Sequence, residues 1–176
     1  NAVGFSGSSA NAGSSGTFNE FEGGAGNDTI TGNGNTRIAF YLATSGVTVD
    51  LAAGYATGDA SVGTDTLNGG VNGVVGSQYD DIFYGRNNAP GTGEIFEGRA
   101  GNDYIDGRGG YDVANYGNDS AVTSGIYVNM AAGTVSGDAS IGYDTLRSIE
   151  VVRGTNFADT YVATGFGSTS TNAGSN

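Results

Sequence analysis

The segment "GRAGNDYIDGRGGYDVAN", residues 98–115, decides the expected fold because it contains two nine-residue units in tandem. Each unit begins with a glycine-containing stretch and has an aspartate in its sixth place, Asp103 and then Asp112, and Ile105 holds the eighth place of the first unit. The units fit the pattern Gly-Gly-x-Gly-x-Asp-x-U-x, where U is a large apolar residue. We expect the first six places to form a turn and the last three a short strand.

Other parts of the chain repeat this pattern. A third close match is "GGAGNDTIT", residues 23–31, with Asp28 in the sixth place and Ile30 in the eighth. Four less regular copies keep the aspartate and the apolar residue: "ASVGTDTLN" with Asp65, "GSQYDDIFY" with Asp81, "ASIGYDTLR" with Asp144 and "GTNFADTYV" with Asp159. In "GNGNTRIAF", however, Thr36 stands where an aspartate is expected. The first half of the chain is therefore expected to lack the site that Asp112 serves.

The chain also consists of two similar halves. Residues 46–67 align with residues 125–146, and the glycine-rich phrase at 21–34 returns at 96–109. We therefore predict homologous halves at 18–93 and 94–166, preceded by a Ser/Gly-rich linker or inter-repeat segment at 1–17. Residues 166–176 resemble residues 5–15, so 167–176 is predicted to start the next linker or repeat. This similarity favours one period of a longer tandem array over a coincidence between two low-complexity segments.

The remaining pattern predicts an all-β fold. Val47, Val49 and Leu51 alternate with polar residues, which is the period of a half-buried strand, and no stretch keeps a helical period. Short strands joined by Gly, Asn and Asp turns are typical of a parallel β-roll or β-solenoid, in which each turn buries few side chains. We expect most of the 18 Tyr and Phe residues to point inward and fill this thin core.

Charge and composition exclude several functions. The net charge of −12 argues against nucleic acid and anionic membranes as partners, and no apolar run is long enough to cross a bilayer. The chain has no His, Cys or Lys, no phosphate-binding loop and no nucleophile elbow. We therefore predict that this segment is not an enzyme and that its acidic residues serve to bind cations.

The repeated turns have the chemistry of a calcium site. Glycines allow positive φ, so carbonyl oxygens can point inward and join a carboxylate in the oxygen cage that Ca²⁺ prefers. Ordinary turn chemistry explains one Asp after Gly-Asn but not seven aspartates at one spacing in so acidic a chain. Asp59 and Asp138 either complete such sites or cap turns. The candidate metal ligands are Asp28, Asp59, Asp65, Asp81, Asp103, Asp112, Asp138, Asp144 and Asp159, with Gly24, Gly26, Gly101 and Gly109.

These motifs resemble those of the RTX (repeats-in-toxin, haemolysin-type) calcium-binding family. The resemblance implies a parallel β-roll holding several Ca²⁺ ions, in a protein that a Gram-negative bacterium exports by type I secretion to its surface or surroundings. Two functions then remain open. One is a structural module of an extracellular fibre, adhesin or surface layer, whose units join end to end. The other is a calcium-dependent module that binds polysaccharide, which a row of exposed aromatic residues on one face would favour.

Overall fold

The computed structural model describes residue 3 and residues 16–173, and in this part of the chain it is almost entirely β. The strands are β1 Asn19–Phe21, β2 Thr29–Ile30, β3 Thr36–Ala39, β4 Thr48–Asp50, β5 Tyr55–Thr57, β6 Thr64–Leu67, β7 Val71–Val75, β8 Ile82–Tyr84, β9 Ile95–Glu97, β10 Tyr104–Asp106, β11 Val113–Asn115, β12 Tyr127–Asn129, β13 Thr134–Ser136, β14 Tyr143–Arg147, β15 Val151–Arg153 and β16 Thr160–Val162. A short 3-10 helix, η1 Thr171–Ala173, follows them. No described helix is long and apolar enough to cross a membrane.

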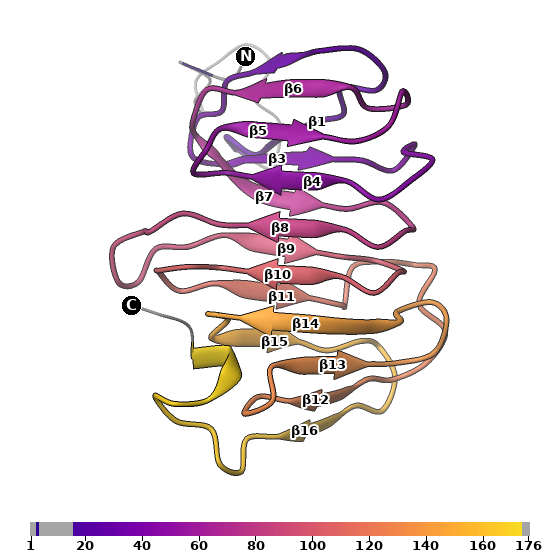
Figure 1. Cartoon of the computed structure of the whole chain (residues 1–176), viewed down its shortest axis with the longest axis vertical. Helices are drawn as coiled ribbons and strands as arrows, with labels where there is room; N and C mark the ends of the chain where they lie inside the picture. Colours follow the sequence, from indigo (N-terminus) through magenta and orange to yellow (C-terminus); the bar gives the residue numbers. More distant parts are fainter. Residues whose placement is uncertain (1–2, 4–15, 174–176) are drawn as a thin grey trace.

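The strands form two sheets, and the chain passes back and forth between them (Figure 1). One sheet has the order β1-β3-β7-β9-β11-β15, and all its pairs are parallel. The other has the order β16-β12-β13-β14-β10-β8-β4-β5-β6-β2. Its pairs are parallel except within the triplets β4-β5-β6 and β12-β13-β14, which are antiparallel. The all-β expectation is therefore confirmed, with two mostly parallel sheets.

The two halves of the chain use the same strand order. Strands β1–β8 come from residues 19–84 and β9–β16 from residues 95–162. In the ten-stranded sheet, β4-β5-β6 lies between β8 and β2, and β12-β13-β14 lies between β16 and β10. The pairing of β8 with β10 joins the halves in this sheet, and β7 with β9 joins them in the other. The internal sequence repeat is thus a repeat of strand order.

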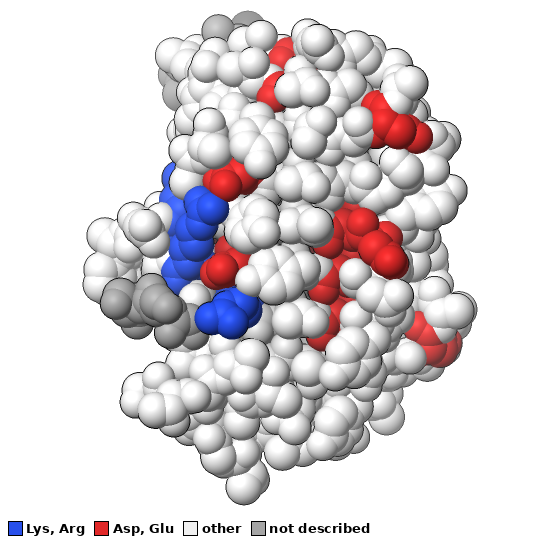
Figure 2. Space-filling model, in the orientation of Figure 1, with Lys and Arg blue, Asp and Glu red and all other residues white. Residues whose placement is uncertain are grey.

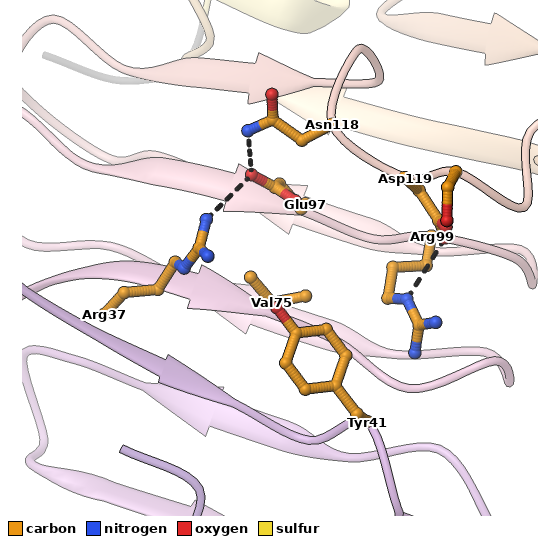
Figure 3. Close-up of a pocket in the computed structure, with 8 residues that line it drawn as sticks. Arg37, Tyr41, Val75, Glu97, Arg99, Asn118 and Asp119 are labelled. Atoms are coloured by element: carbon orange, nitrogen blue, oxygen red, sulfur yellow. Dashed lines mark hydrogen bonds and ion pairs between the residues drawn. The ribbon is translucent and has the colours of Figure 1, made fainter. Parts of the chain in front are cut away.

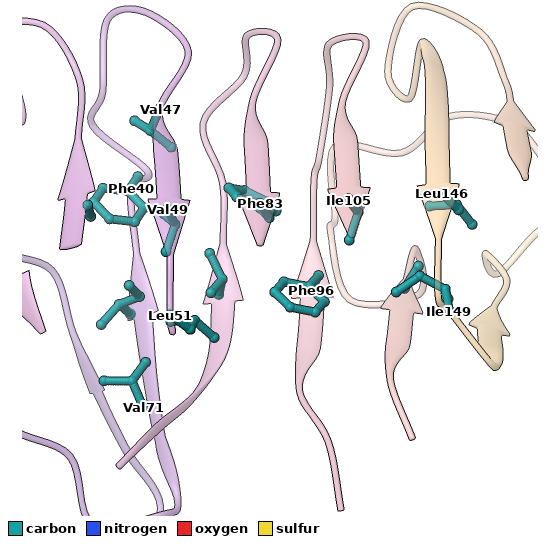
Figure 4. Packing of buried hydrophobic residues seen from close by; sticks show 14 of the residues in the cluster. Phe40, Val47, Val49, Leu51, Val71, Phe83, Phe96, Ile105, Leu146 and Ile149 are labelled. Atoms are coloured by element: carbon teal, nitrogen blue, oxygen red, sulfur yellow. The ribbon is translucent and has the colours of Figure 1, made fainter. Parts of the chain in front are cut away.

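The core is a single layer of side chains between the sheets (Figure 4). Eighth-place residues supply much of it: Ile30, Leu67, Phe83, Ile105 and Leu146 are all buried. At the centre, the rings of Phe83 and Phe96 stack across the two sheets with centroids 6.1 Å apart. Tyr161 holds the same place in the last motif but is 52% exposed, because its strand β16 ends the sheet.

The expectation that most aromatic side chains point inward is wrong. Of the described Tyr and Phe residues, only Phe40, Phe83, Phe96 and Tyr116 are buried. Phe21 is partly buried against the core, and most of the others occupy turns, as Tyr79 does, or outward strand positions. A core one side chain thick leaves room mainly for the alternate strand residues that face inward.

Part of the predicted repeat lies outside the described residues. The similarity between 5–15 and 166–176 involves residues 4–15 and 174–176, whose structure is not described. Within the described part, η1 packs against β14, and Asn172 is 1% exposed. Its side chain accepts a hydrogen bond from Ile149 N at 3.1 Å and donates one to Ile149 O at 2.8 Å. Residues 167–173 therefore include a structured segment.

Candidate metal site

The three close motif copies form turns with one backbone shape. They lie before β2, β10 and β11, and in each the second and fourth residues have positive φ. The values are 72° and 120° at Gly24 and Gly26, 79° and 122° at Arg99 and Gly101, and 62° and 144° at Arg108 and Gly110. The glycine that bends the third turn is therefore Gly110. The predicted ligand Gly109 instead pairs with Asn87, and its carbonyl accepts a hydrogen bond from Asn88 N at 2.6 Å.

In each of these turns the aspartate folds back onto the first glycine. A Cβ atom at Gly98 would lie only 1.9 Å from Asp103 Oδ2, which no real contact allows. The same distance would be 2.7 Å from Gly23 to Asp28 Oδ2 and 2.7 Å from Gly107 to Asp112 Oδ2. The first-place glycine is thus needed because the carboxylate occupies the space of a side chain.

The carboxylates in these turns each have one oxygen without a partner. The Oδ2 atoms of Asp28, Asp103 and Asp112 are buried and make no hydrogen bond. The other oxygen is engaged in two of them: Asp103 Oδ1 accepts from Asp81 N at 2.8 Å, and Asp112 Oδ1 accepts from Glu94 N at 2.7 Å. A buried, unpaired carboxylate oxygen is costly unless a cation or a donor meets it. These three atoms therefore fit a bound metal ion.

Two of the less regular turns satisfy their own aspartates. Asp81 Oδ2 accepts from Ser77 N at 2.7 Å, and Asp81 Oδ1 accepts from Ser77 Oγ at 2.8 Å. Asp159 has the same arrangement with Thr155, whose N and Oγ1 donate at 3.0 and 2.8 Å. Ser77 and Thr155 hold the second place without positive φ. A serine or threonine in the second place therefore satisfies the aspartate of its own turn with two hydrogen bonds.

The other two less regular copies brace the close copies. Asp65 Oδ1 accepts from Asp28 N at 2.9 Å, and Asp144 Oδ1 accepts from Asp103 N at 2.9 Å. Asp144 Oδ2 also accepts from the buried Tyr116 hydroxyl at 2.7 Å. Each of these carboxylates therefore fixes the neighbouring turn through its backbone.

Asp59 and Asp138 belong to exposed loops and have enough partners there. Asp59 accepts from Thr44 Oγ1 at 2.8 Å and from Ser61 N at 2.8 Å, and Asp138 makes the equivalent bonds with Thr123 and Ser140. Hydrogen bonds from the neighbouring serine are the main cause that lowers the pKa of each carboxyl to about 2. The geometry favours turn capping for both residues.

The sequence reasoning missed a second column of acidic residues beside the six-stranded sheet. Asp112 N donates to Glu150 Oε2 at 2.7 Å, so Glu94, Asp112 and Glu150 follow one another on adjacent turns. The signal was an acidic residue two places before an inward strand residue, with Glu in place of Asp. The equivalent column of the first half is neutral: Asn19, Thr36 and Asn72, joined by hydrogen bonds of 2.9 and 3.0 Å.

Comparison with known proteins identifies no family. No family model matches the chain, and no curated protein matches it. The resemblance to RTX proteins therefore rests on the nonapeptide motif alone.

Side chains alone do not form a metal cage. Among the described residues, no three acidic side chains converge as metal ligands, so backbone carbonyls would have to complete any site. On the face shown in Figure 2, several acidic side chains lie on the side where the turns before β8, β10 and β14 are placed. The arginines group on the other side, where further acidic side chains lie among them.

Burial makes the ionised form of these carboxylates unfavourable. Burial, and then the neighbouring Asp144 carboxylate, raise the pKa of Asp103, and burial is also the main cause that raises the pKa of Asp112 and Asp144. Burial raises the pKa of Asp81 to about 6 despite its hydrogen bonds. A cation in the turns would reverse this effect, since an opposite charge favours the carboxylate.

Proposed function

We propose that this chain is a calcium-binding structural module of a secreted or cell-surface repeat protein, built as a calcium-stabilised parallel β-roll of the RTX type. The observation that carries the proposal is the set of unpaired oxygens on Asp28, Asp103 and Asp112. They occur in the three turns that match the motif most closely. Calcium suits such sites because it accepts carboxylate and carbonyl oxygens in flexible geometry.

The proposed ions are unevenly distributed. One turn, residues 23–28, lies in the first half, and two turns, 98–103 and 107–112, lie in the second. Each ion would be held by the turn's aspartate and by backbone carbonyls, including those of Gly24, Gly26 and Gly101. Asp65, Asp144 and Glu150 would support these turns from the next one through their hydrogen bonds. We leave Asp59, Asp81, Asp138 and Asp159 out of the ligand set because their partners are already present.

The sheet ends support a role in an extended assembly. β16 is the last strand of the ten-stranded sheet, and no described strand pairs with its outer edge. A free strand edge is a template for another chain, and head-to-tail contacts that do not close build filaments. Units joined in this way suit an extracellular fibre, adhesin or surface layer, which type I secretion would export.

Calcium should control folding of the module. In excess chelator we expect circular dichroism to show a largely unordered chain, which gains β signal as Ca²⁺ reaches roughly 10⁻⁴–10⁻³ M, the range of extracellular modules. Magnesium at the same concentration is the control. An unchanged, cooperatively melting β-spectrum in chelator would refute the proposal.

Two isosteric variants locate the ions. Asp103→Asn keeps the acceptor for Asp81 N but removes the charge, so we expect one ion fewer per chain by equilibrium dialysis and metal analysis. Asp159→Asn is the matched control, because Asp159 holds the same motif place with both oxygens satisfied. Equal ion counts in the two variants would contradict the assignment.

A second candidate function is polysaccharide binding. The ten-stranded sheet presents Tyr84, Tyr104 and Tyr127 on its outer face, and the rings of Tyr84 and Tyr104 lie 5.8 Å apart. Flat aromatic faces of this kind pack against sugar rings. Retention of the calcium-loaded chain on insoluble polysaccharides, lost in Tyr104→Ala, would favour this candidate.

A further inference from the structure

A pocket of about 380 Å³ lies on the outer face of the six-stranded sheet (Figure 3). Its main polar residues are Arg37 on β3, Tyr41 just after it, Glu97 on β9, Arg99, and Asn118 and Asp119 in the loop after β11. Val75 lines it on β7, and Arg37 and Arg99 lie on opposite sides of Tyr41. This volume is within the range of small-molecule sites.

The pocket is where the two halves of the chain differ most clearly. Asp112 follows its equivalent Thr36 by 76 residues, and Gly125 follows Gly46 by 79. The second half therefore has three extra residues in this loop. The hydrogen bond from Val122 N to Asp119 O corresponds to that from Ala43 N to Phe40 O, so the extra residues lie within residues 116–119. Asn118, Asp119 and Ser120 all line the pocket. An insertion that the scaffold does not need in the first half forms one wall.

A strained arginine forms another wall. Arg99 has a φ of 79°, and the equivalent residue in the first half is Gly24, which adopts a similar φ without strain. A left-handed conformation is strained for a non-glycine residue because its Cβ crowds the following carbonyl oxygen. Such strain is typical of residues that serve a site. Here it places the Arg99 side chain in the pocket, where its guanidinium lies 5.1 Å from the Tyr41 ring centroid.

The pocket holds charges of both signs, already paired. Arg99 Nε donates to Asp119 Oδ2 at 3.1 Å, and Arg37 Nη1 lies 3.4 Å from Glu97 Oε1. Asn118 Nδ2 donates to the same Glu97 oxygen at 2.7 Å, and Glu97 is only 6% exposed. These pairs hold donors and acceptors in fixed positions around the cavity.

This arrangement selects the class of ligand. An anion would face the carboxylates of Glu97 and Asp119, and a cation would face the guanidinium groups of Arg37 and Arg99. A neutral molecule rich in hydroxyl groups meets neither repulsion, because each hydroxyl can donate to a carboxylate and accept from a guanidinium. We propose that this pocket binds a neutral saccharide. Arg99 belongs both to this pocket and to the turn 98–103, whereas the outer tyrosines lie on the other sheet.

Nuclear magnetic resonance titration of the calcium-loaded chain tests the site. The probes are glucose, galactose and mannose, with glucuronate and glucosamine as charged analogues of glucose. We expect a neutral sugar to shift the amide signals of Tyr41, Arg99 and Asn118 with a dissociation constant of roughly 1 mM. The charged analogues should bind at least about tenfold more weakly. The carboxylate of glucuronate would face Glu97 and Asp119, and the ammonium group of glucosamine would face Arg37 and Arg99.

Matched variants separate a ligand site from a structural contact. Arg99→Gly restores the residue type of the first half at a φ that glycine adopts without strain, so we expect folding to be retained and the sugar-induced shifts to disappear. Arg108→Gly is the control: it holds the same motif place with a φ of 62°, but its side chain pairs with Asp50 beside Tyr84. It should bind sugar normally.

Three results would overturn the proposal. The first is that no neutral sugar shifts the amide signals of the pocket residues. The second is that Arg99→Gly and Arg108→Gly lose the sugar-induced shifts equally. The third is that the shifts are confined to Tyr84, Tyr104 and Tyr127. The last result would instead support polysaccharide binding by the ten-stranded sheet. None of them bears on calcium binding, which is measured separately by metal analysis.

Discussion

A single methyl group at Gly98 tests the turn geometry of the proposed ion sites. In Gly98→Ala the new Cβ would lie 1.9 Å from Asp103 Oδ2 and 2.8 Å from its Cγ, so the carboxylate has to leave its place. The backbone of Gly98 is outside the left-handed region, and alanine therefore adds no strain of its own. We expect the variant to lose the ion of this turn.

The size of the effect follows from linkage. Each ion that binds only the folded chain adds about 1.4 kcal/mol to the free energy of unfolding for every tenfold rise in free calcium above its dissociation constant. If each of the three unpaired oxygens binds one ion, the free energy of unfolding of the original chain should rise by about 4 kcal/mol for every tenfold rise in free calcium. For Gly98→Ala, which keeps two of these ions, the rise should be about 3 kcal/mol. The displaced carboxylate also deprives Asp81 N–H of its acceptor, which costs about 1–3 kcal/mol at every calcium concentration.

Urea unfolding at several free calcium concentrations, followed by circular dichroism, measures both terms. Gly167→Ala is the control, because its Cβ would meet nothing within 4 Å, and its calcium dependence should equal that of the original chain. A Gly98→Ala variant that is less stable but keeps the original calcium dependence would refute an ion in this turn.

The remaining predictions concern pH and packing. In chelator, any residual fold should weaken as pH rises from about 4 through 6 and beyond, because buried acids with raised pKa values, such as Asp81 at about 6, bind more protons folded than unfolded. With calcium, stability should instead increase as pH rises, since protons compete with calcium for the carboxylates of Asp28, Asp103 and Asp112. Circular dichroism across pH in both buffers checks this, and parallel profiles would contradict it. Phe83→Ala should lower the free energy of unfolding by about 3–5 kcal/mol, because Phe83 is fully buried against Phe96. Phe157→Ala, at an exposed turn, should change the free energy of unfolding by less than about 0.5 kcal/mol. Similar losses in Phe83→Ala and Phe157→Ala would contradict the position of Phe83 in the core.

The strand pattern was predictable because one rule controls it. A core one side chain thick accepts an apolar residue at each eighth place, so Ile30, Phe83 and Ile105 mark inward strand positions directly in the sequence. The alternation of Val47, Val49 and Leu51 marks another in the same way. The pattern does not tell which sheet a strand joins or that β4-β5-β6 turns antiparallel, since these depend on long-range pairing.

The site was less predictable, because its character depends on neighbours distant in sequence. Asp81 and Asp103 share a motif place, yet only a serine in the second place shows that Asp81 is satisfied by its own turn. Glu94 and Glu150 escaped notice because the motif specifies aspartate. The saccharide pocket is formed by four segments that are distant in the sequence, and the sequence indicates it only through the three extra residues in the loop after β11.

The direction of the strands has a mechanical consequence. They run across the longest axis of the molecule, so tension applied between its two ends would pull neighbouring strands apart rather than slide them (Figure 1). Backbone hydrogen bonds between strands that are loaded in this direction break one after another. The carboxylate links between successive turns, such as Asp103 to Asp81 N and Asp144 to Asp103 N, cross each opening point and resist it. A fibre of such units would owe its tensile strength to its turns, and calcium would set how much load it bears.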